Sequence, residues 1–285
     1  MEVKMRQGIL DNLRYDGGMT AVFRRIGCVG DSLSAGEFEH DVKGIKGFWD
    51  NYQYSYGKFM EYTLRNHVSV FARGGLTAAQ LYEEADRKES PVEEINHLFD
   101  RDCLMQAYVI ALGVNDLMGQ GVLEKVYGGQ IGEPGQDICL EDYRKNKGTF
   151  AGTYAKIIQR LQSMQPGTKF FLVSMPKENQ EQCRTHLEIL QKIAGVLENC
   201  YVIDLYNEAP EYNQEFKEKY FIGGHMNAMG YQLTAWYLMT YIHHIMEENY
   251  RDFQDVPFIG TEYKPATPYT RRESEIDKII NGPTP

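Results

Sequence analysis

Residues 25–34 read RIGCVGDSLS: a short apolar run, 26–29, breaks at Gly30 and leads to a hydroxyl at Ser32. A short apolar run that ends at a glycine is typical of a buried β-strand. In open α/β sheets, ligands bind just beyond the carboxyl ends of the strands, which is where this pattern places Ser32. On this segment alone a helix N-cap is the commoner role for such a serine, so other segments must decide.

Four further short apolar segments repeat the pattern, at 68–72, 108–112, 170–173 and 201–205. Their hydrophobicity is continuous rather than alternating, as expected of parallel strands that are covered on both faces. Apolar residues recur with helical spacing between and after them, at 150–164, 187–197 and 231–245. Strands that alternate with helices predict an α/β fold, a three-layer α/β/α sandwich around a five-stranded parallel sheet.

A chain of 285 residues is long enough for one domain with extensions. We expect an N-terminal extension over residues 1–24, the main domain over 25–248 and an extended, proline-containing tail over 249–285. Residues 117–148 are rich in glycine, and we expect a long loop there, which is a candidate lid.

The composition is that of a globular protein, with 42% hydrophobic and 25% charged residues. A net charge of −10 argues against a nucleic-acid partner, because phosphate binding needs clustered cations. We expect no membrane partner and reduced cysteines, and the sequence leaves homo-oligomer formation open. Residues 1–7 lack the apolar stretch of a secretory signal, so a cytoplasmic location is the expectation.

Two further strand ends carry residues suited to ligand contact. Gly74 and Gly75, after the segment 68–72, let the main chain approach a ligand and present N–H groups to it. Asn115, after the segment 108–112, offers a side-chain amide donor. The structural alternatives are a strand-to-helix turn that Thr77 caps and a turn asparagine bonded to its own backbone.

His225 lies in a glycine-flanked loop before the last helical segment, where it is free to project. A serine hydroxyl needs a base to take its proton as it attacks, and an imidazole serves near pH 7. The attack leaves negative charge on a carbonyl oxygen, for which the backbone N–H groups of Ser32 and Gly75 and the amide of Asn115 are candidate donors. Together the segments predict acyl transfer, with Ser32 as nucleophile and His225 as base.

These blocks resemble, in order, those of the SGNH hydrolase superfamily, also called the GDSL esterase/lipase family. They are residues 30–33 (GDSL), 74–77 (GGLT), 113–116 (GVND) and the loop around His225. The resemblance runs from about residue 25 to about residue 244, and implies a flavodoxin-like fold and ester hydrolysis with the roles given above. We expect no cofactor and no metal, and take Asp31 and Gly74 as candidate substrate-binding residues.

One position departs from that family, which usually carries an aspartate three residues before the histidine to orient it. The position is Ile222 here, and its side chain accepts no N–H bond. Three explanations are open: a backbone carbonyl near Ile222 orients His225, Asp204 replaces the missing acid, or the machinery has decayed. We favour the carbonyl, although losing an orienting acid is costly in triad enzymes.

The segment 48–56 (FWDNYQYSY) follows the nucleophile block closely. Its rings suit sugar stacking, but aromatics mostly serve burial, and we favour packing of a helix against the sheet. With no exposed apolar run for a long acyl chain, a small polar ester such as an acetylated saccharide is the expected substrate. The competing function is a non-catalytic module that binds a glycan or acyl ligand. Nucleotide binding is disfavoured, because GxGxxG and GxxxxGK[ST] are both absent.

Overall fold

Five parallel strands form the central sheet of the computed structural model, which describes residues 8–178 and 181–262. They are β1 (Arg25–Gly30), β4 (His67–Ala72), β5 (Ala107–Ala111), β6 (Lys169–Val173) and β7 (Cys200–Ile203). Their spatial order, β4-β1-β5-β6-β7, is that of flavodoxin-like sheets. The predicted fold class is therefore confirmed, and each predicted strand is correct to within about two residues.

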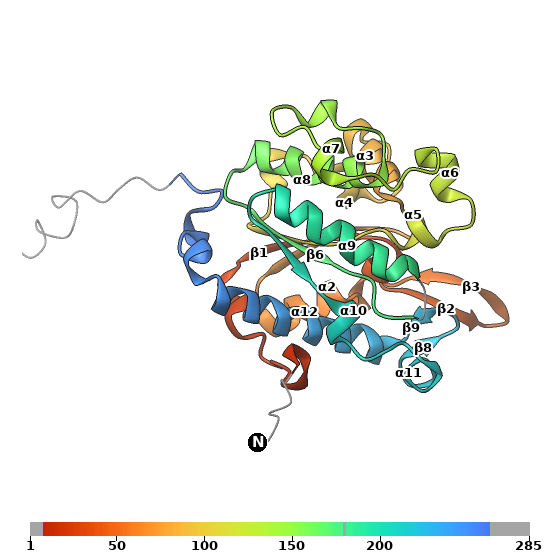
Figure 1. Cartoon of the computed structure of the whole chain (residues 1–285). Helices are drawn as coiled ribbons and strands as arrows, with labels where there is room; N and C mark the ends of the chain where they lie inside the picture. Colours follow the sequence, from red (N-terminus) through yellow and green to blue (C-terminus); the bar gives the residue numbers. More distant parts are fainter. Residues whose placement is uncertain (1–7, 179–180, 263–285) are drawn as a thin grey trace, which may run out of the picture.

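Helices cover both faces of the sheet, as Figure 1 shows. One face is covered by α3 (Ala78–Arg87), α8 (Phe150–Met164) and α9 (Glu181–Val196), and the other by α2 (Tyr56–Leu64) and α12 (Ala228–Glu248). The three predicted helical segments fall within α8, α9 and α12, apart from residue 197, which lies one position beyond α9. Short helices sit near the strand ends: α1 (Ser32–Ala35), α4 (Glu93–Asn96), α5 (Val114–Met118), α10 (Leu205–Glu208) and α11 (Gln214–Tyr220).

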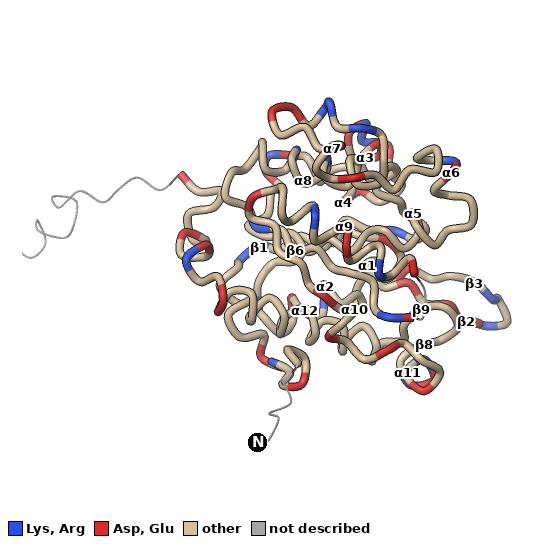
Figure 2. The backbone as a smooth tube through the Cα atoms, in the orientation of Figure 1, with Lys and Arg blue, Asp and Glu red and all other residues tan. Residues whose placement is uncertain are grey.

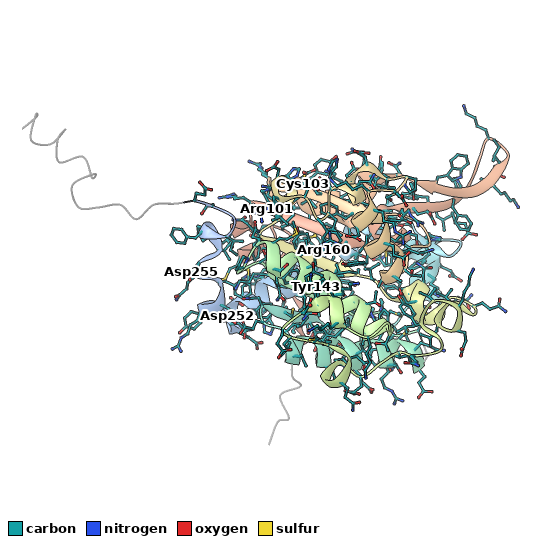
Figure 3. The ribbon with its side chains drawn as sticks, turned by 90° about the horizontal axis from the view of Figure 1, so that it is seen from above. Arg101, Cys103, Tyr143, Arg160, Asp252 and Asp255 are labelled. Atoms are coloured by element: carbon teal, nitrogen blue, oxygen red, sulfur yellow. The ribbon has the colours of Figure 1, made fainter. Side chains whose placement is uncertain are left out.

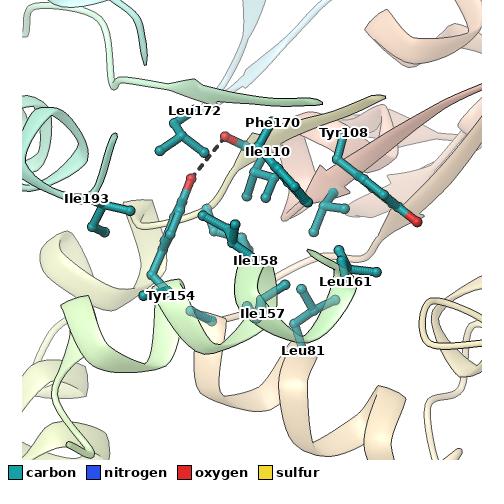
Figure 4. Close-up of a cluster of buried hydrophobic side chains, with 14 of the residues drawn as sticks. Leu81, Tyr108, Ile110, Tyr154, Ile157, Ile158, Leu161, Phe170, Leu172 and Ile193 are labelled. Carbon is teal, nitrogen blue, oxygen red and sulfur yellow. Dashed lines mark hydrogen bonds between the residues drawn. The ribbon is translucent and has the colours of Figure 1, made fainter. Parts of the chain in front are cut away.

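Side chains of the central strands alternate between two hydrophobic cores, one on each face of the sheet. In β6, Phe170 enters one core and Phe171 the other. Figure 4 shows the first core, in which the Tyr154 hydroxyl donates to the backbone oxygen of Ile110 at 3.2 Å. Because every residue of β6 is buried, the strand is hydrophobic throughout instead of alternating.

The chain on either side of the predicted main domain packs against it. Residues 8–24 form two 3₁₀ turns, η1 (Ile9–Asp11) and η2 (Gly18–Val22), and Thr20 Oγ1 donates to the Met239 oxygen in α12 at 2.9 Å. Residues 249–262 form η6 (Tyr250–Phe253) and η7 (Val256–Phe258), which bury Phe253 in the core. The rest of the predicted tail, 263–285, lies outside the described residues.

The glycine-rich segment 117–148 is not the long loop that we expected. It contains α6 (Val122–Tyr127), α7 (Pro134–Asp137) and η5 (Tyr143–Lys145). The Tyr127 hydroxyl donates to buried Asp116, and Asp137 accepts from the Thr149 hydroxyl at 2.9 Å. These contacts bind Tyr127 and Asp137 of the segment to Asp116 and Thr149, the residues on either side of it.

A hairpin follows α1 and projects from the body, as Figures 1 and 3 both show. It pairs β2 (Glu37–Val42) with β3 (Ile45–Asp50) in antiparallel register, beside a smaller pair, β8 (Phe221–Ile222) and β9 (His225–Met226). Phe48 and Trp49 lie on the hairpin and are 62% and 38% exposed. The expectation that these two rings pack a helix against the sheet is therefore wrong.

All five cysteines are free thiols, as predicted: Cys28, Cys103, Cys139, Cys183 and Cys200. Among the helices of the described residues, none combines the length and the hydropathy needed to cross a bilayer.

Candidate active site

The predicted site residues meet at the carboxyl ends of three neighbouring strands. In an open sheet the crevice forms where the strand order reverses, which here lies between β1 and β5. An open cavity of about 710 Å³ lies there, lined by five predicted residues: Ser32, Gly74, Gly75, Asn115 and His225. It is also lined by Phe48, Asp50 and Tyr52 of the segment 48–56, and by four residues that the sequence did not indicate: Glu37, Arg73, Pro91 and Val92.

Ser32 is the first residue of α1, so its backbone N–H has no partner within the helix. The N-cap is Asp31, whose carboxylate accepts the backbone N–H of Leu33 at 3.1 Å. The capping role considered for the serine therefore belongs to its neighbour. Within the described residues the Ser32 hydroxyl makes no hydrogen bond, either to His225 or to another group.

Asp31 does not line the cavity, in contrast to the substrate-binding role that we predicted. It is buried, and burial raises the pKa of its carboxyl to about 7 although the Leu33 N–H opposes the shift. The Nδ2 atom of Asn115 lies 3.4 Å from Asp31 Oδ2. Asp31 therefore contacts Asn115, and it lines a separate, mostly apolar pocket together with Leu33 and Tyr56.

The residues that carry the candidate donors, Ser32, Gly75 and Asn115, line the cavity. Gly75 has a φ of +69° and open space on its Cβ side, so a ligand can approach its backbone closely. Asn115 Nδ2 donates to the Leu76 oxygen at 3.2 Å, and its contact with Asp31 is near the limit of a hydrogen bond. The Thr77 hydroxyl accepts the backbone N–H of Gln80 at 3.2 Å and so caps α3. The predicted helix cap is therefore present, and it does not exclude close approach of a ligand to the Gly75 backbone.

His225, the first residue of β9, is held between two carboxylates of the hairpin. Its Nε2 lies 3.1 Å from Glu37 Oε1, and its Nδ1 lies 3.9 Å from Glu39 Oε2. The hydrogen bond to Glu37 raises the pKa of the imidazole, and partial burial opposes this shift. The Phe48 ring meets the imidazole edge-on, with the centroids 5.4 Å apart.

Neither partner expected for His225 is found. Asp204 is instead the N-cap of α10, where it accepts a backbone N–H at 2.9 Å. Ile222 pairs with His225 in the β8–β9 register, but within the described residues Nδ1 has no hydrogen-bond partner, a carbonyl included. The acids come from β2, and the available signal was the alternation of Glu37 and Glu39 directly after the nucleophile block.

The hairpin side of the cavity is acidic, and Figure 2 shows acidic positions where β2, β3 and β9 meet. Glu37 and Asp50 face each other across the hairpin. Burial, followed by the negative charge of Glu37, raises the pKa of Asp50. Arg73 donates from Nε to Glu84 at 3.0 Å, so its charge already has a partner at the rim. In the described part of the chain, no three His, Cys, Asp or Glu side chains are arranged to hold a metal ion.

No residue of the segment 117–148 lines the cavity. Only its first two residues, Leu117 and Met118, belong to α5, the helix that carries Asn115. The expected lid is therefore absent from this site. The hairpin β2–β3 borders the cavity instead, because Glu37, Phe48 and Asp50 all line it.

A family model, the GDSL-like Lipase/Acylhydrolase family, matches residues 28–233. Among solved structures, the chain is similar to a family 2 carbohydrate esterase with a carbohydrate binding domain from Corynascus thermopiles (Myceliophthora fergusii). That match has 19% identity and a TM-score of 0.52, and covers 79% of this chain and 67% of that one.

A family two carbohydrate esterase from Clostridium thermocellum, in complex with cellohexaose, matches with 16% identity and a TM-score of 0.52. It covers 80% of this chain and 65% of the other, so this chain spans about two thirds of the length of both esterases. At such identities the likeness shows the fold alone. No curated protein matches the chain.

Proposed function

Because the chain belongs to the GDSL-like lipase/acylhydrolase family, we propose that it hydrolyses carboxylic esters through an acyl-enzyme on Ser32. The observation that carries the proposal is the shared cavity. It brings together a hydroxyl, an imidazole and two groups of N–H donors from four separate segments of the chain. That is the set of groups that acyl transfer requires.

In the proposed reaction, Ser32 Oγ attacks the ester carbonyl carbon while His225 takes its proton. The backbone N–H groups of Ser32 and Gly75 and the Asn115 amide stabilise the negative oxygen; losing one such donor typically costs about 2.7–4 kcal/mol. The carbon–oxygen bond to the alcohol then breaks, and His225 returns the proton to the leaving alkoxide. Water, activated by the same imidazole, cleaves the acyl-enzyme and releases the acid.

A short-chain or acetyl ester of a polar alcohol, such as an acetylated saccharide, is the proposed substrate. The cavity is open and carries many polar groups, and exposed Phe48 offers an apolar face of the kind that stacks on a sugar ring. The solved structures with TM-scores above 0.5 include carbohydrate esterases, which supports this substrate class.

The test is covalent labelling with a fluorophosphonate, followed by turnover of p-nitrophenyl esters. We expect Ser32→Ala to abolish labelling, and Ser163→Ala, an exposed serine on α8, to leave it intact. Acetyl esters should be cleaved faster than octanoyl esters. A rate that rises steeply with chain length would contradict the proposed substrate, and labelling that survives in Ser32→Ala would contradict the proposed nucleophile.

A non-catalytic binding module is the second candidate, and one observation favours it. The Ser32 hydroxyl makes no hydrogen bond to His225 within the described residues, and Glu37 is bonded to the imidazole instead. Calorimetric binding of an acetylated saccharide, together with no probe labelling of the unmodified protein, would favour this module over the enzyme.

A further inference from the structure

We propose that Glu39 is the positioning residue for His225, in place of the aspartate that the family usually carries at the position of Ile222. The inference rests on the proposed function, since it gives the orienting acid for the same base. In this chain the orienting acid would lie on a hairpin far away in the sequence, and not in the loop before the histidine.

The contacts of Glu39 place its carboxylate on the Nδ1 side of the imidazole. Its Oε2 accepts the backbone N–H of Gly224 at 2.6 Å and lies 3.9 Å from His225 Nδ1. Nδ1 is buried and has no hydrogen-bond partner in the described residues. A buried N–H without a partner is costly, and a shift of about 1 Å would give it an acceptor in Glu39.

The two glycines before His225 explain how a distant acid reaches the ring. A Cβ at Gly223 would overlap the Glu39 carboxylate, and one at Gly224 would lie 3.3 Å from Oε2. Gly223 also has a φ of +64°, which disfavours other residues. The loop that lacks an acid at Ile222 therefore leaves a space, and the Glu39 side chain fills it.

Glu37 cannot take the same role, because it bonds the other ring nitrogen. It lies 3.1 Å from Nε2, and its carboxylate lies beside Gly74, which lines the cavity together with Ser32 and Gly75. In the proposal, Nε2 is the nitrogen that receives the Ser32 proton. We expect an ester that enters this space to displace the Glu37 carboxylate from the imidazole, while Glu39 remains on the Nδ1 side of the ring.

The test compares acidic residues on the same strand. Glu37, Glu39 and Asp41 alternate onto one face of β2, and exposed Asp41 pairs with Lys46, away from the cavity. We expect Glu39→Gln to lower kcat for p-nitrophenyl acetate by about 10- to 1000-fold, with KM nearly unchanged. This is less than the roughly 10⁴-fold loss in a buried triad, because Glu39 is partly exposed. The matched control, Asp41→Asn, should keep the original kcat.

Rescue separates positioning from a general loss of structure. In the Glu39→Gln background, Ile222→Asp restores an acid at the usual family position, and we expect it to recover at least tenfold in kcat. Glu39→Asp should retain more activity than Glu39→Gln. Unchanged kcat in Glu39→Gln, or a decrease confined to Glu37→Gln, would overturn the proposal, as would failure of the rescue in a folded double variant.

A second readout does not depend on turnover. In the proton NMR spectrum at low pH, the His225 Nδ1–H should give a downfield resonance that Glu39→Gln removes and Glu37→Gln retains. If the protein shows no Ser32-dependent hydrolysis, the proposed function fails, but this resonance still tests the link between Glu39 and His225. A resonance that persists in Glu39→Gln would contradict that link.

Discussion

At the scale of single residues, the acids around His225 raise the pKa of its imidazole and so favour its protonated form. Glu37 contributes most to the raised pKa, and Glu39 and Asp31 add to it. In the proposed mechanism His225 must be neutral to accept the Ser32 proton, so we expect the activity to fall below this pKa. We therefore expect the acids around His225 to set the lower pH limit of the proposed hydrolysis.

The first prediction concerns that limit. The acidic limb of kcat/KM should lie above the usual imidazole value of 6.5, and Glu37→Gln should move it to lower pH, because the substitution removes the main cause of the raised pKa. pH–rate profiles with p-nitrophenyl acetate measure the acidic limb in the original protein and in Glu37→Gln. An acidic limb that stays in place in Glu37→Gln, or one that moves as far in the Asp41→Asn control, would contradict this account.

The second prediction concerns buried Asp31. Its pKa in the folded protein, about 7, lies above the unfolded value of 3.8, so the folded state binds the proton more tightly. Stability therefore falls as the pH rises from about 4 to about 7, and the full cost is present above that range. Asp31→Asn, which keeps a capping oxygen, should gain about 1–4 kcal/mol over the original protein at pH 8 and little at pH 4. Urea unfolding at both pH values measures this, and equal gains at both would contradict it.

At the scale of elements, the five strands were predictable because burial on both faces leaves each one continuously apolar, as in β6. The hairpin β2–β3 was missed because most of its described residues are exposed and its apolar and charged residues are mixed, so it has no continuous apolar run. The helices of 117–148 were missed because α6 and α7 are each only one to two turns long among glycines. Periodicity needs a longer run than that to appear.

The candidate site likewise contains residues that could be predicted from the sequence and one that could not. Ser32, Gly75 and Asn115 were predictable because each follows a strand, and parallel strands bring their carboxyl ends to one edge. Glu39 was not, because its contact with the loop of His225 joins residues 185 positions apart. Only the folded hairpin makes that contact visible.

The third prediction concerns the hairpin as a binding element. Phe48 lines the cavity and is 62% exposed, so Phe48→Ala should raise KM for an acetylated saccharide about 3- to 10-fold without lowering thermal stability. KM for p-nitrophenyl acetate should change less. Ile45→Ala is the control, because Ile45 is equally exposed on the same hairpin but does not line the cavity. An equal effect in both variants would count against a sugar-stacking role.

At the scale of the whole molecule, the segment after α12 completes the core at the end opposite the hairpin. In Figures 1 and 3 this segment, marked by the labels Asp252 and Asp255 in Figure 3, lies far from the hairpin. Phe253 stacks on Phe171 of β6, with the ring centroids 6.3 Å apart and the planes 5° from parallel. The stability of the sheet and the chemistry of the site therefore depend on opposite ends of the protein.

The fourth prediction tests this separation. Phe253→Ala should lower the free energy of unfolding by about 3–5 kcal/mol, because it leaves a cavity in the core. At a temperature where the variant remains folded, its kcat should be that of the original protein. Tyr250→Ala, in the same turn but 57% exposed, should be nearly neutral. Thermal melts and rate assays measure the two effects, and a kcat that falls together with stability would contradict the separation.

The acids beside His225, the proposed base, lie on the two-stranded hairpin β2–β3, so the proposed activity depends on that hairpin. Isolated pairs of strands are marginally stable, and such units open locally at a fraction of the global unfolding free energy. In a urea titration, hydrolysis should therefore disappear while far-ultraviolet circular dichroism still reports an intact sheet. Local unfolding of the hairpin would then stop the proposed hydrolysis at a urea concentration at which the rest of the molecule is still folded.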